Sequence, residues 1–143
     1  VCNYDASSIS EIITRSNEVN STFLIGDHPA HALVSPDNSL LYVSNYGSDS
    51  VAVYSIDTGR RAGSVSVGSH PEMFALSPNQ LLLLVINTGS SDLSVVSLID
   101  SKGRPLFPRP SPQAAMVPLG PETMIPLGKD PRAIAVKAFI TQR

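Results

Sequence analysis

The three histidines are the residues of this sequence whose type most readily suggests chemistry, because imidazole is a common metal ligand and a general base near neutral pH. Two of them open similar stretches, HPAHALVSPDN from His28 and HPEMFALSPNQ from His70, and the third is His31. His28 and His70 lie 42 residues apart (70 − 28), so they act together only if the fold brings the two stretches close. The elements that carry them therefore decide what they do.

Both stretches belong to a longer repeat. An offset of 42 residues aligns residues 26–57 with residues 68–99 without a gap, and 13 of the aligned pairs are identical. The same offset places the opening VCNYDASSIS on the stretch from Val43, and GKDPRAIAV from Gly128 repeats GDHPAHALV after about 18 additional residues. A period of about 40 to 45 residues is typical of proteins built from structural repeats.

Each repeat has the pattern of four short strands. In the first full copy they are AHALV, LLYVSN, SVAVYSI and AGSVSV, separated by the turn sequences SPDN, YGSD and DTGR. LLYVS and its counterpart LLLLVI are apolar at consecutive positions, so both faces of their sheets must be covered. We therefore predict an all-β chain, a β-propeller of four-stranded blades with about three blades present, as a partial propeller or part of a larger ring.

The repeat predicts a single partial propeller over residues 1–143. Seven of the 12 prolines lie between Asp100 and Gly128, and proline removes backbone donors, so an extended surface loop is expected there. An open arc would expose two apolar blade faces, so we expect the remaining blades of a longer protein, or a second chain, to close the ring. The expected units are the end of a first blade (1–25), a complete blade (26–67), a blade with a Pro-rich insertion at about 101–122 (68–127), and the first strand of a further or closing blade (128–143).

The stretch HPAHALVSPDNSLLYVSNYGSDSVAVYSIDTG resembles the YVTN repeat, in which a proline and an apolar strand precede Ser-Pro-Asp-Gly, Tyr-Val-Thr-Asn and Val-Ser-Val-Ile-Asp. It departs from that unit at Asn38, where glycine is usual. The related lactonase-like propellers, which include bacterial 6-phosphogluconolactonases, share the HP, SPD and NYGS signatures. The resemblance implies a bacterial protein placed outside the cytoplasm, in the periplasm, secreted or at the cell surface.

The resemblance also implies that the first strand of each blade is innermost, so the loops that lead into it meet at the mouth of the channel. Because Asp130 replaces histidine in the third copy, the following proline is the repeated structural feature and a metal site is disfavoured. Glu72 and Arg132 align with Ala30, and this variation argues against a requirement of the fold, which leaves solvated loop charges as the first interpretation and contact with a ligand or partner as the second. We predict no metal and no cofactor, and the candidate ligand-binding residues are His28, His31, His70, Glu72, Asp130 and Arg132.

The loops after the second strands reach the same face and carry Asn3, Asn45 and Asn87. Asn45 and Asn87 lie just before turn glycines, where an asparagine side chain can bond its own backbone, so these two residues are interpreted as structural.

These residues lead to two functional hypotheses. The first is a non-enzymatic binding module that recognises a protein, a glycan or a small ligand at the channel mouth. The alternative is a lactone hydrolase of the 6-phosphogluconolactonase type, with Glu72, His70 and Arg132 orienting or activating water. The sequence contains no G-x-S-x-G, H-E-x-x-H or Gly-rich phosphate motif, which favours the first.

Composition excludes several other classes. The 10 basic and 12 acidic residues give a net charge of −2 without basic runs, so nucleic-acid binding is not expected. The longest apolar run, LLLLVI, is much shorter than the roughly 20 residues that span a bilayer. Cys2 is the only cysteine, so the chain has no internal disulfide.

Overall fold

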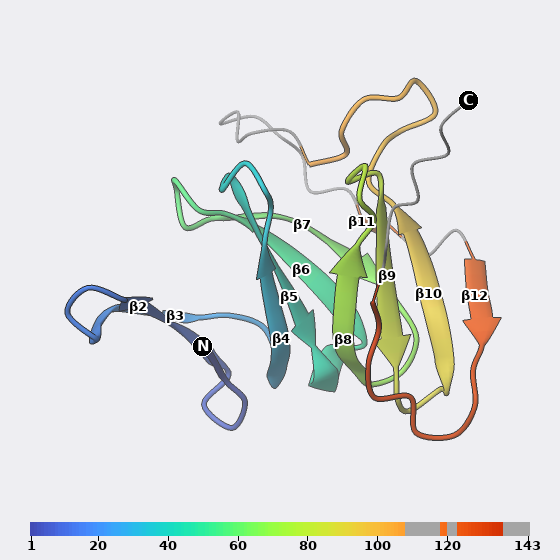
Figure 1. Ribbon diagram of the computed structural model, residues 1–143, viewed down its shortest axis with the longest axis horizontal. Helices are drawn as coiled ribbons and strands as arrows, with labels where there is room; N and C mark the ends of the chain where they lie inside the picture. Colours follow the sequence, from blue (N-terminus) through green and yellow to red (C-terminus); the bar gives the residue numbers. More distant parts are fainter. Residues whose placement is uncertain (108–117, 120–122, 136–143) are drawn as a thin grey trace.

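The computed structural model describes residues 1–107, 118–119 and 123–135 (Figure 1). Within these residues the chain is built of short strands and turns, with one 3-10 turn, η1 (Tyr46–Ser48). No helix in this part of the chain is long and apolar enough to cross a membrane. The strands are β1 (Cys2–Asn3), β2 (Ser8–Ile13), β3 (Glu18–Leu24), β4 (Pro29–Val34), β5 (Leu40–Asn45), β6 (Ser50–Ser55), β7 (Arg61–Ser66), β8 (Pro71–Leu76), β9 (Leu82–Asn87), β10 (Asp92–Ser97), β11 (Pro118–Leu119) and β12 (Thr123–Pro126).

The strands form three separate sheets, ordered β1-β2-β3, β11-β7-β6-β5-β4 and β12-β10-β9-β8. Consecutive strands pair antiparallel, and neighbouring sheets approach each other through β1, β4 and β8 (Figure 1). The predicted all-β partial propeller is confirmed. The first strand of each of the two larger sheets thus lies next to its counterpart, which places the loops before β4 and β8 close together.

The same backbone hydrogen bond occurs directly after β3, β7 and β12, one strand in each of the three sheets. The amides of Ile25, Val67 and Leu127 donate to the carbonyl oxygens of Ser7, Asp49 and Ser91 at 3.0, 3.0 and 2.8 Å. The three acceptors are spaced by 42 residues, and all three have a positive φ, between 47° and 55°. The insertion before β12 therefore leaves the blade plan unchanged.

The insertion contains two near copies, MVPLG and MIPLG, and both contribute backbone to a sheet. β12, from the second copy, pairs antiparallel with β10 and completes its own blade. β11, from the first copy, pairs parallel with β7 of the preceding blade. The insertion is thus hydrogen-bonded to two blades.

The core lies between the two larger sheets. Valine side chains on β6, β7 and β9 (Val51, Val53, Val65 and Val85) are fully buried, as the apolar runs predicted. Phe107, inside the insertion, joins this cluster with 6% of its surface exposed. Residues 101–105 are exposed, in keeping with the expected surface loop, whereas Leu106 and Phe107 pack against the core.

Phe107 packs against the backbone of β7 at Gly63. A Cβ built on Gly63 would lie 2.5 Å from Phe107 Cε1, so the ring fits only against a residue without a side chain. Phe107 belongs to a buried cluster whose other members come from both larger sheets.

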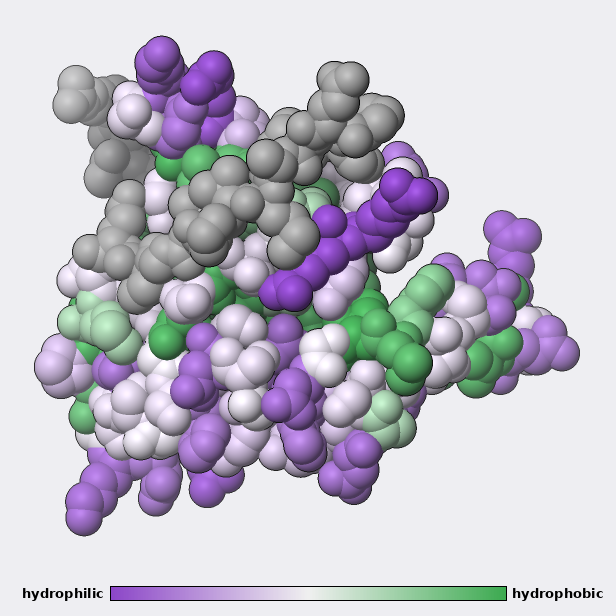
Figure 2. Space-filling view, turned by 180° about the vertical axis from the view of Figure 1, so that it is seen from behind, coloured by the Kyte–Doolittle hydropathy of each residue, from purple (hydrophilic) through white to green (hydrophobic). Residues whose placement is uncertain are grey.

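Apolar side chains are exposed at both ends of the arc. On β2 and β3 they include Ile12, Val19 and Leu24, of which Leu24 is 88% exposed, and Met124 and Ile125 are exposed on β12. Figure 2 shows green side chains gathered where the β2–β3 hairpin projects. Closure of the ring by further blades or by a second chain stays a prediction. The strand expected at 128–143 also stays a prediction, because residues 131–135 form no strand and residues 136–143 lie outside the described residues.

Replacing Phe107 with alanine should lower the free energy of unfolding by about 3 kcal/mol, because it leaves a cavity between two blades. Urea unfolding followed by circular dichroism measures the change, with Lys102→Ala as the control because this side chain is exposed. A loss equal to that of the control would contradict a packing role for the ring.

Candidate functional site

The loops before β4 and β8 share an unusual backbone. His28 and His70, each followed by proline, have φ of 51° and 53°, and Asp130 in the third copy has φ of 52°. Among residues other than glycine, the left-handed region is best tolerated by Asn, Asp and His. The exchange of histidine for aspartate in the third copy is therefore explained by the backbone that this loop adopts.

Hydrogen bonds to the preceding blade and to its own blade hold each loop. The His70 amide donates to Asp49 Oδ1 of the preceding blade at 2.8 Å, and the His28 amide donates to Ser7 Oγ at 3.4 Å. Within the blade, the carbonyl oxygen of His28 accepts from the Tyr46 amide at 3.0 Å, and that of His70 accepts similarly. The loop is thus a joint between blades as well as the start of a strand.

The two histidine rings belong to a row of aromatic side chains across the mouth. Tyr4 contacts His28 and Tyr46 edge to face, with centroid distances of 4.8 and 5.6 Å. Tyr46 in turn stacks on His70 at 4.4 Å and 4°. His28 Nδ1 also lies 2.6 Å from Asp27 Oδ1. Within the described residues no three His, Cys, Asp or Glu side chains are grouped as a metal ion would require.

The structure brings four of the six predicted site residues together. His70, Glu72, Asp130 and Arg132 line one cavity of about 240 Å³ at the mouth. The remaining lining is Tyr46, Thr88 and Gly89. A Cβ on Gly89 would lie 2.5 Å from His70 Nδ1, so this glycine allows the imidazole to lie against the loop. We name this space the mouth cavity.

The mouth cavity holds charged groups that are not paired with each other. Within the part of the chain that the structure describes, Glu72, Asp130 and Arg132 take part in no ion pair. The Thr88 hydroxyl donates to the His70 carbonyl oxygen at 3.1 Å. Two carboxylates and one guanidinium therefore remain available to a ligand.

His28 and His31 are not part of this lining. His31 lies on β4, and its ring meets Phe74 edge to face at 4.7 Å and 83°. Its Nδ1 is buried without a hydrogen-bond partner, and burial lowers the pKa of the imidazole below 6.5. His31 is thus a packing residue between two inner strands.

The asparagines of the second strands are structural, but they do not bond their own backbone as expected. Asn87 donates to Asp92 Oδ1 at 2.6 Å and to Ser94 Oγ at 2.8 Å, and Asn3 donates to two serines in the same way. Asn45 and Asn87 are almost fully buried. The next residues along the chain, Tyr46 and Thr88, reach the mouth cavity instead. Because successive side chains of a strand point in opposite directions, this position next to a buried asparagine could have been predicted from the sequence.

The architecture agrees with what known proteins show. The protein-family model described as "Lactonase, 7-bladed beta-propeller" matches residues 1–112. The chain belongs to the seven-bladed β-propeller lactonase family. This membership confirms the expected relationship to lactonase-like propellers. No curated protein matches this lactonase-family chain in sequence.

Solved structures similar to this lactonase-family chain are of longer chains. Hydrazine synthase from Kuenenia stuttgartiensis has a TM-score of 0.62 and 25% identity, over 72% of this chain and 29% of that chain. A 6-phosphogluconolactonase candidate from Bacteroides fragilis has a TM-score of 0.60 and 23% identity, over 71% and 31%. A protein from Lactobacillus plantarum has a TM-score of 0.58 and 22% identity, over 71% and 35%. The chain spans about a third of the length of these structures, and the likeness shows the fold.

Substitutions at His70 separate the backbone requirement from that of the ring. His70→Asn and His70→Val both remove the stack on Tyr46, but only valine is β-branched and strongly disfavoured at positive φ. The free energy of unfolding of the valine variant should therefore be about 1 to 2 kcal/mol lower than that of the asparagine variant. Equal stabilities in urea unfolding would contradict the backbone explanation.

His31 predicts a stability that depends on pH. Burial lowers its pKa in the folded state, so the unfolded chain binds the proton more readily and folding stability falls as the pH drops below 6.5. His31→Leu should make the melting temperature less sensitive to pH between about 7.5 and 5.5. If the melting temperature of this variant differs between the two pH values as much as that of the unsubstituted protein, other groups cause the pH dependence.

Proposed function

We propose that the mouth cavity is a non-enzymatic binding site for a small hydroxylated carboxylate of the sugar-acid class. The observation that carries the proposal is the convergence of His70, Glu72, Asp130 and Arg132 on one cavity. The extracytoplasmic placement implied by the YVTN resemblance belongs to the same proposal.

The size and lining of the cavity support a compact polar ligand. At about 240 Å³ the mouth cavity is smaller than the roughly 300 to 1,000 Å³ typical of sites for drug-sized molecules. Arg132 supplies a planar guanidinium that can form two hydrogen bonds with one carboxylate. Glu72 and Asp130 supply acceptors for hydroxyl groups, so one end of the ligand would be anionic and the rest hydroxylated.

The aromatic row supplies the wall of the site. Because Tyr46 and His70 are stacked and both line the cavity, they present a rigid aromatic surface at its edge. Such a surface suits the apolar C–H faces of a sugar-derived chain, while the charged groups bind its oxygens.

Calorimetry with D-gluconate tests this proposal. Arg132→Ala should weaken gluconate binding at least about tenfold, because it removes charge-assisted hydrogen bonds to the carboxylate. Binding of D-glucitol, which has no carboxylate, should be weaker and unaffected by this substitution. Arg60→Ala is the matched control, since Arg60 is exposed and does not line the mouth cavity. Absence of gluconate binding, or an equal effect of both arginine variants, would refute the proposal.

Lactone hydrolysis is the second candidate, favoured by the presence of His70, Glu72 and Arg132 in one cavity of a lactonase-family chain. In this reaction Glu72 would accept a proton from water attacking the lactone carbonyl, and Arg132 would stabilise the resulting oxyanion. The ring C–O bond then breaks and its oxygen takes up a proton. Turnover of glucono-δ-lactone that is lost in Glu72→Gln would establish this candidate in place of simple binding.

A further inference from the structure

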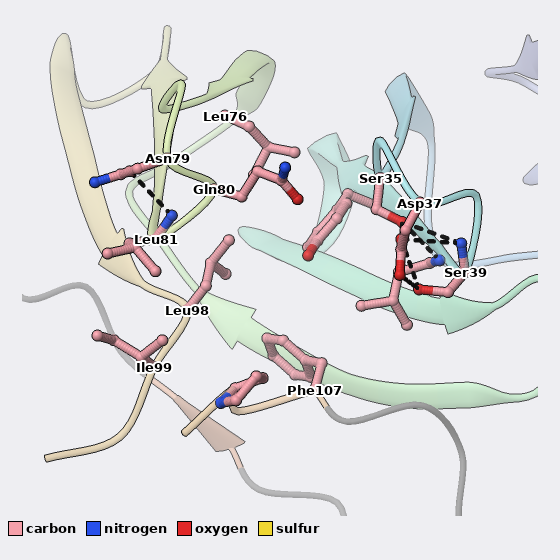
Figure 3. Close-up of a pocket in the computed structure, with 13 residues that line it drawn as sticks. Ser35, Asp37, Ser39, Leu76, Asn79, Gln80, Leu81, Leu98, Ile99 and Phe107 are labelled. Carbon is pink, nitrogen blue, oxygen red and sulfur yellow. Dashed lines mark hydrogen bonds between the residues drawn. The ribbon is translucent and has the colours of Figure 1, made fainter. Parts of the chain in front are cut away.

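A second cavity lies at the opposite end of the same two blades. The turns that follow β4 and β8, at residues 35–39 and 77–81, face each other across a space of about 480 Å³ (Figure 3). We name it the inter-blade cavity. Because the mouth loops precede β4 and β8 whereas these turns follow them, the two cavities are separated by the length of the strands.

The walls of the inter-blade cavity combine apolar and polar side chains. Among the apolar ones, Leu40 comes from one blade, Leu76 and Leu98 come from the other, and Phe107 comes from the insertion. In Figure 3 Leu98 and Phe107 lie on the same side of the space, opposite the two turns. A ligand there would have an apolar part as well as polar groups.

Two polar side chains of the turns, Asp37 and Asn79, already have hydrogen-bond partners. Asp37 Oδ1 accepts hydrogen bonds from Ser35 Oγ at 2.6 Å and from the Ser39 amide at 3.2 Å. Asn79 Oδ1 accepts from Ser77 Oγ at 2.6 Å and from the Leu81 amide at 3.2 Å. These hydrogen bonds, drawn in part in Figure 3, shape the turns, so the side-chain oxygens are engaged within the protein.

Tyr42 differs from these groups. It is only 5% exposed and lines the cavity, yet its hydroxyl has no hydrogen-bond partner among the described residues. The hydroxyl oxygen keeps some accessible surface, unlike the unpaired side-chain atoms that are completely buried, so it can be reached from the cavity. Burial, with a smaller contribution from the charge of Asp37, raises the pKa of Tyr42 to about 12. The phenol thus stays protonated at ordinary pH and offers a hydrogen-bond donor.

We propose that the inter-blade cavity binds a small molecule with an apolar part and a carbonyl oxygen, which accepts a hydrogen bond from Tyr42. Its volume of about 480 Å³ lies within the roughly 300 to 1,000 Å³ typical of small-molecule sites. A carbonyl satisfies the unpaired donor, and the apolar side chains of the walls accommodate the apolar part. This site is independent of the function proposed for the mouth cavity.

The neutral aromatic ketone Prodan is a suitable probe, because its fluorescence shifts to the blue when it leaves water. We expect saturable binding with such a shift, and an affinity about three- to tenfold lower for Tyr42→Phe, which removes only the donor. Tyr54→Phe is the matched control, since Tyr54 is half-buried and does not line this cavity. Thermal unfolding confirms that both variants are folded.

A second variant keeps the test decisive if Tyr42→Phe is unstable. Leu81 is 38% exposed at the cavity edge, so Leu81→Trp should fill the space without disturbing the core and abolish binding. Phe23→Ser, on the exposed β3, should leave binding unchanged. No saturable binding, retention of binding in Leu81→Trp, equal affinities in the two tyrosine variants, or loss in Phe23→Ser would each overturn the proposal.

Discussion

Face-to-face packing of small sheets is the interaction on which this structure depends. Neither of the two larger sheets has a core of its own, because the side chains that are fully buried, such as Val51 and Leu83, are enclosed only when the sheets meet. The central residues of the strands therefore carry buried apolar side chains, and polar groups available for binding lie in the loops at the two ends of the strands. Both cavities follow from this arrangement, since each lies where strands end and two blades diverge.

The backbone of the mouth loops adds a second constraint. A left-handed residue before proline limits the position to a few residue types, and two of these, histidine and aspartate, also carry useful chemistry. At His70 and Asp130 the same positions therefore serve the fold and line a cavity. At His28 the same backbone occurs, but the ring packs on Tyr4 and bonds to Asp27. A repeated loop thus supplies similar side chains, and the neighbours of each copy decide their use.

Much of the fold could be predicted because the 42-residue period is visible in the sequence, and each copy repeats the same hydrogen bonds. The site was harder to predict. His31 was assigned to the mouth from its position near His28, but strand alternation and packing on Phe74 place it between the blades. Tyr46 and Thr88 were not predicted, because the repeated asparagines beside them were the more conspicuous polar residues. The asparagine amides form hydrogen bonds inside the sheet. Burial of Phe107 could not be anticipated, since the complement of its ring is a glycine 44 residues earlier (107 − 63) in another blade.

The parallel pairing of β11 with β7 has a consequence for how the chain unfolds. In repeat proteins each unit contacts only its neighbours, and stability is approximately a sum of unit and interface contributions, so units can open one at a time. Here a segment between β10 and β12 is hydrogen-bonded to the outer edge of the preceding sheet, and Phe107 is anchored beside it. That edge strand is also no longer free to recruit another chain. Separating these two blades requires breaking backbone pairing as well as packing, which joins them into one cooperative unit.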